Sequence, residues 1–120
     1  MYAIGGRALT ADKNLAAFEQ FEPSTGKWRK GPSMAASRSG LGAAIVDGKV
    51  YAVGGEDRVQ VLGTVEAFDL TTGTAWLPAP SMSARHGLAV QAVGPSLYAI
   101  DGGRQTGATE PSKVAEVFRP

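Results

Sequence analysis

The sequence predicts an all-β fold: a β-propeller segment of about two and a half four-stranded antiparallel blades. Two observations carry this prediction. A short apolar strand that ends in two glycines occurs three times within 120 residues. Five landmarks of different chemistry also return at intervals of 47 to 50 residues. A repeat period of about 40–50 residues is typical of propeller blades. The recurring positions are Tyr2, Tyr51 and Tyr98; Glu19, Glu66 and Glu116; Trp28 and Trp76; the Pro-Ser-Met runs at 32–34 and 80–82; and the diglycines Gly5-Gly6, Gly54-Gly55 and Gly102-Gly103.

The first unit, residues 1–36, supplies three strands. Residues 1–4 form a strand before Gly5-Gly6, and a polar loop covers 7–14. The next two strands are expected over 15–21 and 27–29, on either side of a Pro-Ser-Thr-Gly turn.

The second unit, residues 37–84, is complete. Its strands are expected at 40–46, 49–53, 64–69 and 74–77, and Asp47-Gly48 is a strong two-residue hairpin signal between the first two. The small apolar residues of 40–46 predict a strand buried on both faces.

The third unit, residues 85–120, repeats only three of these strands, at 87–93, around Tyr98 and at 113–118. We interpret Asp101 as an extra residue inserted before the diglycine, forming a bulge or a longer turn.

Read in order, the landmarks resemble the Kelch repeat: a hydrophobic residue and Tyr, diglycine, a polar loop, Glu-x-Phe, a Thr-Gly turn, Trp, and Pro-Ser-Met. The resemblance covers essentially the whole chain. It implies a β-propeller with one four-stranded blade per repeat, and it does not by itself imply an activity, because this fold hosts many functions.

Because the expected strands number three, four and three, this stretch cannot close a ring. We expect it to be part of a longer propeller. The alternative is that several copies assemble into a ring, since open blade edges invite pairing with other chains. Size-exclusion chromatography with light scattering separates these two possibilities. The number of blades in the complete ring stays open.

Composition excludes several classes of function. The net charge of +1 gives no reason to expect nucleic acid or membrane binding. The chain has no cysteine, which excludes disulfides and thiolate metal sites and is compatible with a reducing, cytoplasmic compartment without establishing one. His86 is the single histidine, so a transition-metal site is not expected, and no cofactor is predicted.

The repeated residues are expected to be structural. The diglycines lack the residues that follow in phosphate-binding loops and fit strand ends that need unusual backbone angles. Glu19, Glu66 and Glu116 occur once per unit, as scaffold residues do. We expect them to bind backbone N–H groups or an arginine of a neighbouring blade. Trp28 and Trp76 are expected to pack between adjacent blades.

The candidate partner-binding residues are Arg38, Ser39, Arg85, His86, Arg58 and Arg104. The Kelch resemblance places Arg38 and Arg85 on the innermost strand, near the mouth of the central channel, where guanidinium groups could bind acidic ligands. The alternative is an ion pair between blades with a repeated Glu or Asp. Arg58 and Arg104 lie in loops 56–63 and 104–112, which differ in sequence while their flanks repeat.

Two functions remain open at this point. The first is a non-enzymatic protein-interaction scaffold that binds a protein or peptide, acidic segments among them, through these loops and arginines. The alternative is part of a Kelch-type sugar-active enzyme, epimerase-like, or a carbohydrate-binding propeller. No Ser/His/Asp set or nucleophile elbow is present to support catalysis, and no catalytic residue is assigned. No motif in the sequence identifies the partner.

Overall fold

The computed structural model describes residues 1–10, 12–107 and 110–120. In this part of the chain all regular structure is β, and no helix is long and apolar enough to cross a membrane. The ten strands are β1 (Tyr2–Ile4), β2 (Phe18–Glu22), β3 (Lys27–Lys30), β4 (Gly42–Val46), β5 (Lys49–Val53), β6 (Val65–Asp69), β7 (Leu77–Ala79), β8 (Ala89–Val93), β9 (Ser96–Ile100) and β10 (Ala115–Phe118).

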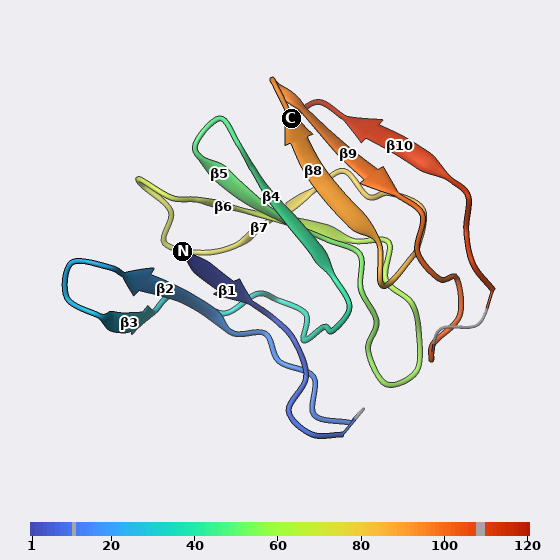
Figure 1. Cartoon of the computed structure of the whole chain (residues 1–120), viewed down its shortest axis with the longest axis horizontal. Helices are drawn as coiled ribbons and strands as arrows, with labels where there is room; N and C mark the ends of the chain where they lie inside the picture. Colours follow the sequence, from blue (N-terminus) through green and yellow to red (C-terminus); the bar gives the residue numbers. More distant parts are fainter. Residues whose placement is uncertain (11, 108–109) are drawn as a thin grey trace.

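The strands form three antiparallel sheets with the orders β1-β2-β3, β4-β5-β6-β7 and β8-β9-β10. Every neighbour within a sheet is also the neighbour in sequence, as in a meander. Figure 1 shows the three sheets splayed like parts of a fan, with β4 and β8 side by side. The predicted all-β propeller segment with three, four and three strands is therefore confirmed. The blade limits after residues 36 and 84 stay predictions.

The apolar core lies between the sheets. One cluster, which includes Phe18, Phe68 and Trp76, joins the first sheet to the second. A second cluster, which includes Tyr51, Val65 and Leu97, joins the second sheet to the third. Since strand side chains alternate between the two faces of a sheet, the middle sheet contributes odd-numbered residues of β5 to one interface and even-numbered residues to the other.

Two details of the strands differ from the predictions. The innermost strands β4 and β8 are not buried on both faces, because Ile45 and Val93 are 45% and 61% exposed. Ala43 and Ala89, on the same faces of these two strands, are exposed as well. The last strand of the second sheet begins after Trp76 and contains Pro78, which an edge strand tolerates.

The second diglycine fits a tight approach of two sheets. Gly54 and Gly55 have φ of 63° and 98°, in the region that glycine adopts most readily. A Cβ atom on Gly54 would lie 2.5 Å from the carbonyl oxygen of Arg85, and one on Gly55 would lie 2.7 Å from that of Ser39. Because both obstacles are backbone atoms, a larger residue cannot be accommodated by moving a side chain.

The interpretation of Asp101 as an inserted residue was wrong. The strand register pairs Ile100 with Ala115 as it pairs Val53 with Val65, so Asp101 occupies the position of Gly54. Its φ of 58° matches the 63° of Gly54. Aspartate enters this left-handed region more readily than most residues, so the turn is kept without a glycine.

The two tryptophans differ in environment. Trp76 is 7% exposed and packs between the first and second sheets. Trp28 is 48% exposed, so its expected packing between blades is not seen among the described residues and stays a prediction. Its ring contacts that of Phe21 in its own sheet, with centroids 5.2 Å apart.

Candidate functional site

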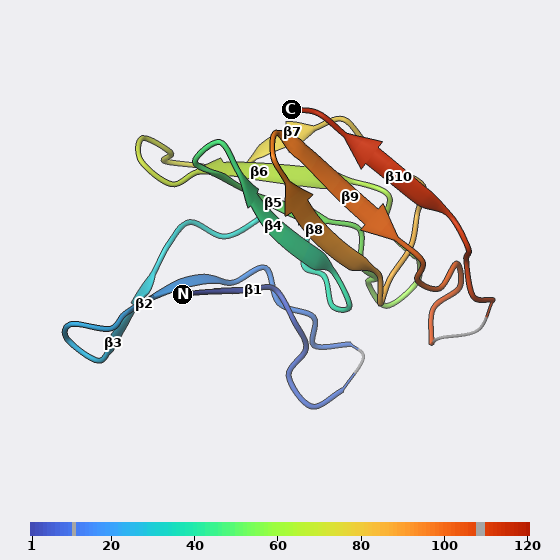
Figure 2. The ribbon, with the colours of Figure 1, turned by 45° about the horizontal axis from the view of Figure 1, so that its top comes forward.

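Three loops gather at one end of the sheets. They follow the strands β1, β5 and β9 and contain residues 7–14, 56–63 and 104–112, of which 11, 108 and 109 lie outside the described residues. Figures 1 and 2 both place these loops together, at the end of the fan away from the β4–β5 hairpin. We call this end the loop face. It combines the segments whose sequences vary most between the repeats.

Arg38 clamps the base of the second loop. Its guanidinium is fully buried and donates hydrogen bonds to the carbonyl oxygens of Gly54 and Thr64, at 3.0 and 2.9 Å. These residues flank the loop on both sides. The same guanidinium forms an ion pair of 2.6 Å with Glu66. Burial lowers the pKa of Arg38 below its ordinary value, and Glu66 opposes this effect by favouring the charged form.

Glu66 completes the clamp from β6. Its carboxylate also accepts backbone hydrogen bonds from Ala35 and Ala36, at 2.7 and 3.3 Å. It therefore fixes the crossing segment between the first and second sheets. The predicted backbone N–H partners are present, while the arginine comes from the start of the same sheet as Glu66 and not from a neighbouring one.

Arg85 repeats this arrangement in the third sheet. It is 1% exposed, donates to the carbonyl oxygens of Asp101 and Val114, and forms an ion pair with Glu116. Glu116 in turn accepts a hydrogen bond from the backbone N–H of Ser83. The second and third loops are therefore both held at their base by an ion pair between a buried arginine and a glutamate.

The first sheet lacks this support. Glu19 occupies the equivalent position on β2, opposite Ala3 as Glu66 is opposite Ala52. Within the described part of the chain its carboxylate makes no hydrogen bond or ion pair. The first loop is instead held by contacts with the neighbouring sheet.

Glu56 provides those contacts and joins all three loops. It is 6% exposed, and one carboxylate oxygen lies 2.6 Å from Nη2 of Arg7 in the first loop. The other oxygen accepts a hydrogen bond of 3.1 Å from the N–H of Gly107 in the third loop. Its backbone oxygen accepts a bond of 3.0 Å from Asn14. No sequence signal marked Glu56, because neither of the other two units has a carboxylate at this position.

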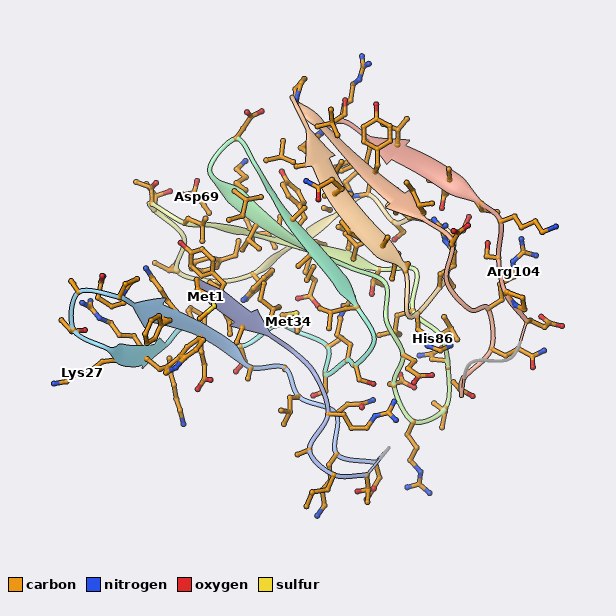
Figure 3. The ribbon with its side chains drawn as sticks, viewed as in Figure 1. Met1, Lys27, Met34, Asp69, His86 and Arg104 are labelled. Atoms are coloured by element: carbon orange, nitrogen blue, oxygen red, sulfur yellow. The ribbon has the colours of Figure 1, made fainter. Side chains whose placement is uncertain are left out.

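Ser39 and His86 lie beside this carboxylate. The hydroxyl of Ser39 accepts a hydrogen bond of 2.8 Å from Arg7, and Nδ1 of His86 is 3.8 Å from Glu56. Nε2 of His86 lies 2.8 Å from the carbonyl oxygen of Gln105, so Nε2 must carry the proton, since a carbonyl can only accept. Figure 3 shows His86 where the second and third loops approach each other.

The tip of the second loop has its own internal order. Asp57 accepts hydrogen bonds from the backbone N–H groups of Val59 and Gln60, at 2.7 and 2.8 Å. The bond from Val59 makes the largest contribution to lowering the pKa of Asp57 below its ordinary value. This turn leaves Val59 79% exposed and places Arg58 at the surface.

The predicted partner-binding residues therefore divide into two groups. Arg38, Arg85, Ser39 and His86 are all at least 90% buried and engaged with other residues, so the expectation that the two arginines meet a ligand directly conflicts with their burial. They position the loops. Arg58 and Arg104 are exposed, and their guanidinium groups make no hydrogen bond or ion pair within the described residues. Figure 3 shows Arg104 at the outer side of the third loop.

No group of three potential metal-binding side chains occurs among the described residues. The buried carboxylates of Glu56 and Glu66 are each held by an arginine and by backbone N–H groups. These contacts hold both carboxylates in fixed positions. This chemistry suits a rigid recognition surface.

Neutralising Glu56 should release the third loop from the second. A hydrogen bond to a buried charged group is worth about 1.5–3 kcal/mol, so Glu56→Gln should raise the amide exchange rate of Gly107 by about tenfold or more. Native-state hydrogen exchange measures this rate. The matched control is Glu110→Gln, which neutralises an exposed carboxylate of the same loop and should leave Gly107 unchanged. Equal effects of the two variants would contradict the joining role of Glu56.

Comparisons with known proteins agree with this architecture. The family model described as Kelch motif matches residues 1–35 and 37–83. Kelch-like protein 8 of Mus musculus is 38% identical over 69 residues, which cover 58% of this chain and 11% of that protein. A putative F-box/kelch-repeat protein of Arabidopsis thaliana is 33% identical over 106 residues, which cover 83% of this chain and 26% of that protein. The chain thus spans from about a tenth to a quarter of the length of these relatives.

The repeated sheets and the loops at one end define a repeat protein of the β-propeller class. The match to the family model over more than half of the residues identifies the particular family. The chain belongs to the Kelch repeat family.

Proposed function

We propose that this chain is part of a non-enzymatic protein-interaction scaffold and that its loop face binds a protein segment. One observation carries the proposal. The three loops that vary between repeats lie at one end of the sheets and are joined by Glu56 into one surface. Binding surfaces are commonly built from variable loops on a rigid scaffold. The Kelch relatives support an interaction scaffold in general terms.

The exposed side chains of the loop face indicate which chemical groups a binding partner must carry. Arg58 and Arg104 present exposed guanidinium groups, and Leu9 and Val59 are 96% and 79% exposed. The carboxylates of Glu56 and Asp57 point inward to hydrogen-bond donors of the loops. A segment that combines carboxylates with apolar side chains complements this surface, because guanidinium groups bind carboxylates in a bidentate way.

Two exposed carboxylates, Asp12 and Glu110, belong to the same loops and moderate the positive charge. Attraction of an acidic segment is therefore expected to be local to the arginines and sensitive to salt, since exposed charges are screened over about 10 Å at 0.1 M ionic strength. Binding that strengthens with added salt would oppose an electrostatic contribution.

The test is a peptide array of acidic and apolar segments, with the best binder measured by titration. Arg58→Glu combined with Arg104→Glu should weaken this binder by about tenfold or more, as charge reversal replaces attraction with repulsion. Lys27→Glu combined with Arg29→Glu makes the same charge change on the exposed strand β3, outside the loop face. Equal weakening by both double variants would refute the assignment of the loop face. Arg38 is unsuitable for this test because it is fully buried.

A further inference from the structure

The ring of His86 lies between the second and third loops, with an acceptor oxygen at each of its two nitrogens. Nε2 is 2.8 Å from the carbonyl oxygen of Gln105 in the third loop, and Nδ1 is 3.8 Å from Oε2 of Glu56 in the second. The residue is only 8% exposed, so water has little access to these groups. A neutral imidazole has one N–H and can donate to one of the two acceptors, whereas the protonated ring can donate to both. Only a ring with a proton on each nitrogen therefore matches its surroundings.

The backbone of the third unit makes room for this ring and fixes its place. His86 and Gly103 exchange two backbone hydrogen bonds, at 3.0 and 2.8 Å. A Cβ atom on Gly103 would lie 2.7 Å from Nε2. Gly103 does not have a positive φ, so a side chain is excluded here by the ring and not by the backbone conformation. The position of both ring nitrogens is therefore set by close packing.

The repeat supplies a comparison for this contact. Ser39 follows Arg38 as His86 follows Arg85, and Ser39 bridges to Glu56 as His86 bridges to Gly103. Between the first and second loops, Arg7 donates to the hydroxyl of Ser39 and to Glu56. A guanidinium and a hydroxyl keep their charge between about pH 5 and 8, whereas an imidazole changes its charge in this range. The contact between the second and third loops thus contains a pH-sensitive group where the preceding contact has a serine.

Glu56 has room for a second hydrogen bond at the oxygen that faces the ring. Oε1 pairs with Arg7, while Oε2 accepts a bond of 3.1 Å from the N–H of Gly107. A carboxylate oxygen can accept two hydrogen bonds. At 3.8 Å, Nδ1 is beyond the limit of about 3.2 Å for an N–H···O hydrogen bond, so ring and carboxylate move closer when that bond forms.

Two further charged side chains lie near the ring. Asp101 and Lys113 line, together with His86, a hollow of about 470 Å³ on the third sheet. Both are exposed and they carry opposite charges, so their effects on the ring are screened by solvent and oppose each other. Glu56 is therefore the charged group expected to respond most strongly to protonation of Nδ1.

We propose that His86 is a pH-sensitive contact that closes the third loop onto the second as the pH falls from about 8 to about 5. With both nitrogens protonated, the ring donates to Glu56 and to Gln105 and ties the two loops together. As the pH rises, Nδ1 loses its proton, its lone pair faces the carboxylate, and the tie to Glu56 is lost. An influence on partner binding rests on the proposed function, whereas the closure of the loops is measured without any partner.

Native-state hydrogen exchange of Gly107 in the 120-residue chain tests the closure. After correction for the intrinsic pH dependence of exchange, its protection should be about tenfold higher at about pH 5.5 than at about pH 8, as one added charged hydrogen bond implies. Amides of β5 serve as references for overall stability. Because the chain has a single histidine, its Cε1–H resonance in NMR spectra reports the protonation of His86 directly. The two pH curves should coincide. Constant protection while the ring titrates, or a ring that keeps one protonation state across this range, would overturn the proposal.

Three variants locate the effect. His86→Gln keeps an amide donor for the carbonyl of Gln105 but cannot titrate, so the protection of Gly107 should become equal at the two pH values. Gly103→Ala displaces the ring and leaves every titratable group in place, so it should also remove most of the pH effect. Lys113→Gln neutralises an exposed neighbour of the ring and should leave the tenfold effect unchanged. If His86→Gln keeps the pH effect, or if Lys113→Gln removes it equally, the assignment to His86 is refuted.

Discussion

Replacing Trp76 by alanine should lower the free energy of unfolding by about 3–5 kcal/mol, the range found for large aromatic residues truncated in protein cores. The ring is 7% exposed and contacts Phe18 of the first sheet, with ring centroids 5.3 Å apart. Its removal leaves a cavity between two sheets and an unpaired carbonyl at Pro32. Urea unfolding followed by far-ultraviolet circular dichroism measures the loss.

The chain contains its own control for this experiment. Trp28 stands at the same repeat position, is 48% exposed and packs on Phe21 of its own sheet. Trp28→Ala should therefore cost about 1 kcal/mol or less, in the range of aromatic pairs at partly exposed sites. If Trp28→Ala and Trp76→Ala lower the free energy of unfolding by the same amount, Trp76 is not stabilised by contacts between the sheets. The described packing of the first sheet on the second would then be wrong.

The fold could be predicted because residues with a structural role recur at the repeat spacing. Tyrosine and glutamate recur at matching strand positions, and the register places them in the same way in each sheet. Asp101 shows where the method fails. Counting the diglycine as a fixed landmark suggested an insertion, but the backbone needs only a left-handed residue there, which aspartate can supply.

The candidate site was less predictable, because it depends on pairs formed across the fold. Arg38 has the residue type of a ligand-binding group, and only its three-dimensional surroundings show that its terminal nitrogens already donate to Glu66 and to two carbonyl groups. Glu56 could not be found from the repeat, since its partners Arg7 and Gly107 are 49 and 51 residues away and have no counterparts in the other units. A recognition surface of this kind is built from residues that differ between the repeats, so the repeat pattern does not reveal it.

Glu66→Ala is expected to cost about 3–5 kcal/mol, the range measured when one partner of a buried ion pair is removed. The change leaves the fully buried guanidinium of Arg38 without its counter-charge and frees two backbone N–H groups of the crossing segment. Chemical denaturation measures the loss. Because Arg58 and Arg104 do not contact Glu66, the folded variant should keep the preference of the loop face among acidic peptides.

Glu19→Ala separates this effect from a general role of the repeated glutamate. Glu19 has the same position on its strand but makes no hydrogen bond or ion pair among the described residues, so its loss should change stability by about 0.5 kcal/mol or less. Replacing both members of the buried pair, as Arg38→Met with Glu66→Leu, should restore part of the stability lost in Glu66→Ala, since no uncompensated charge then remains. A double variant as unstable as the sum of the single variants would show that Arg38 and Glu66 act independently, and the clamp beneath the second loop would have to be abandoned.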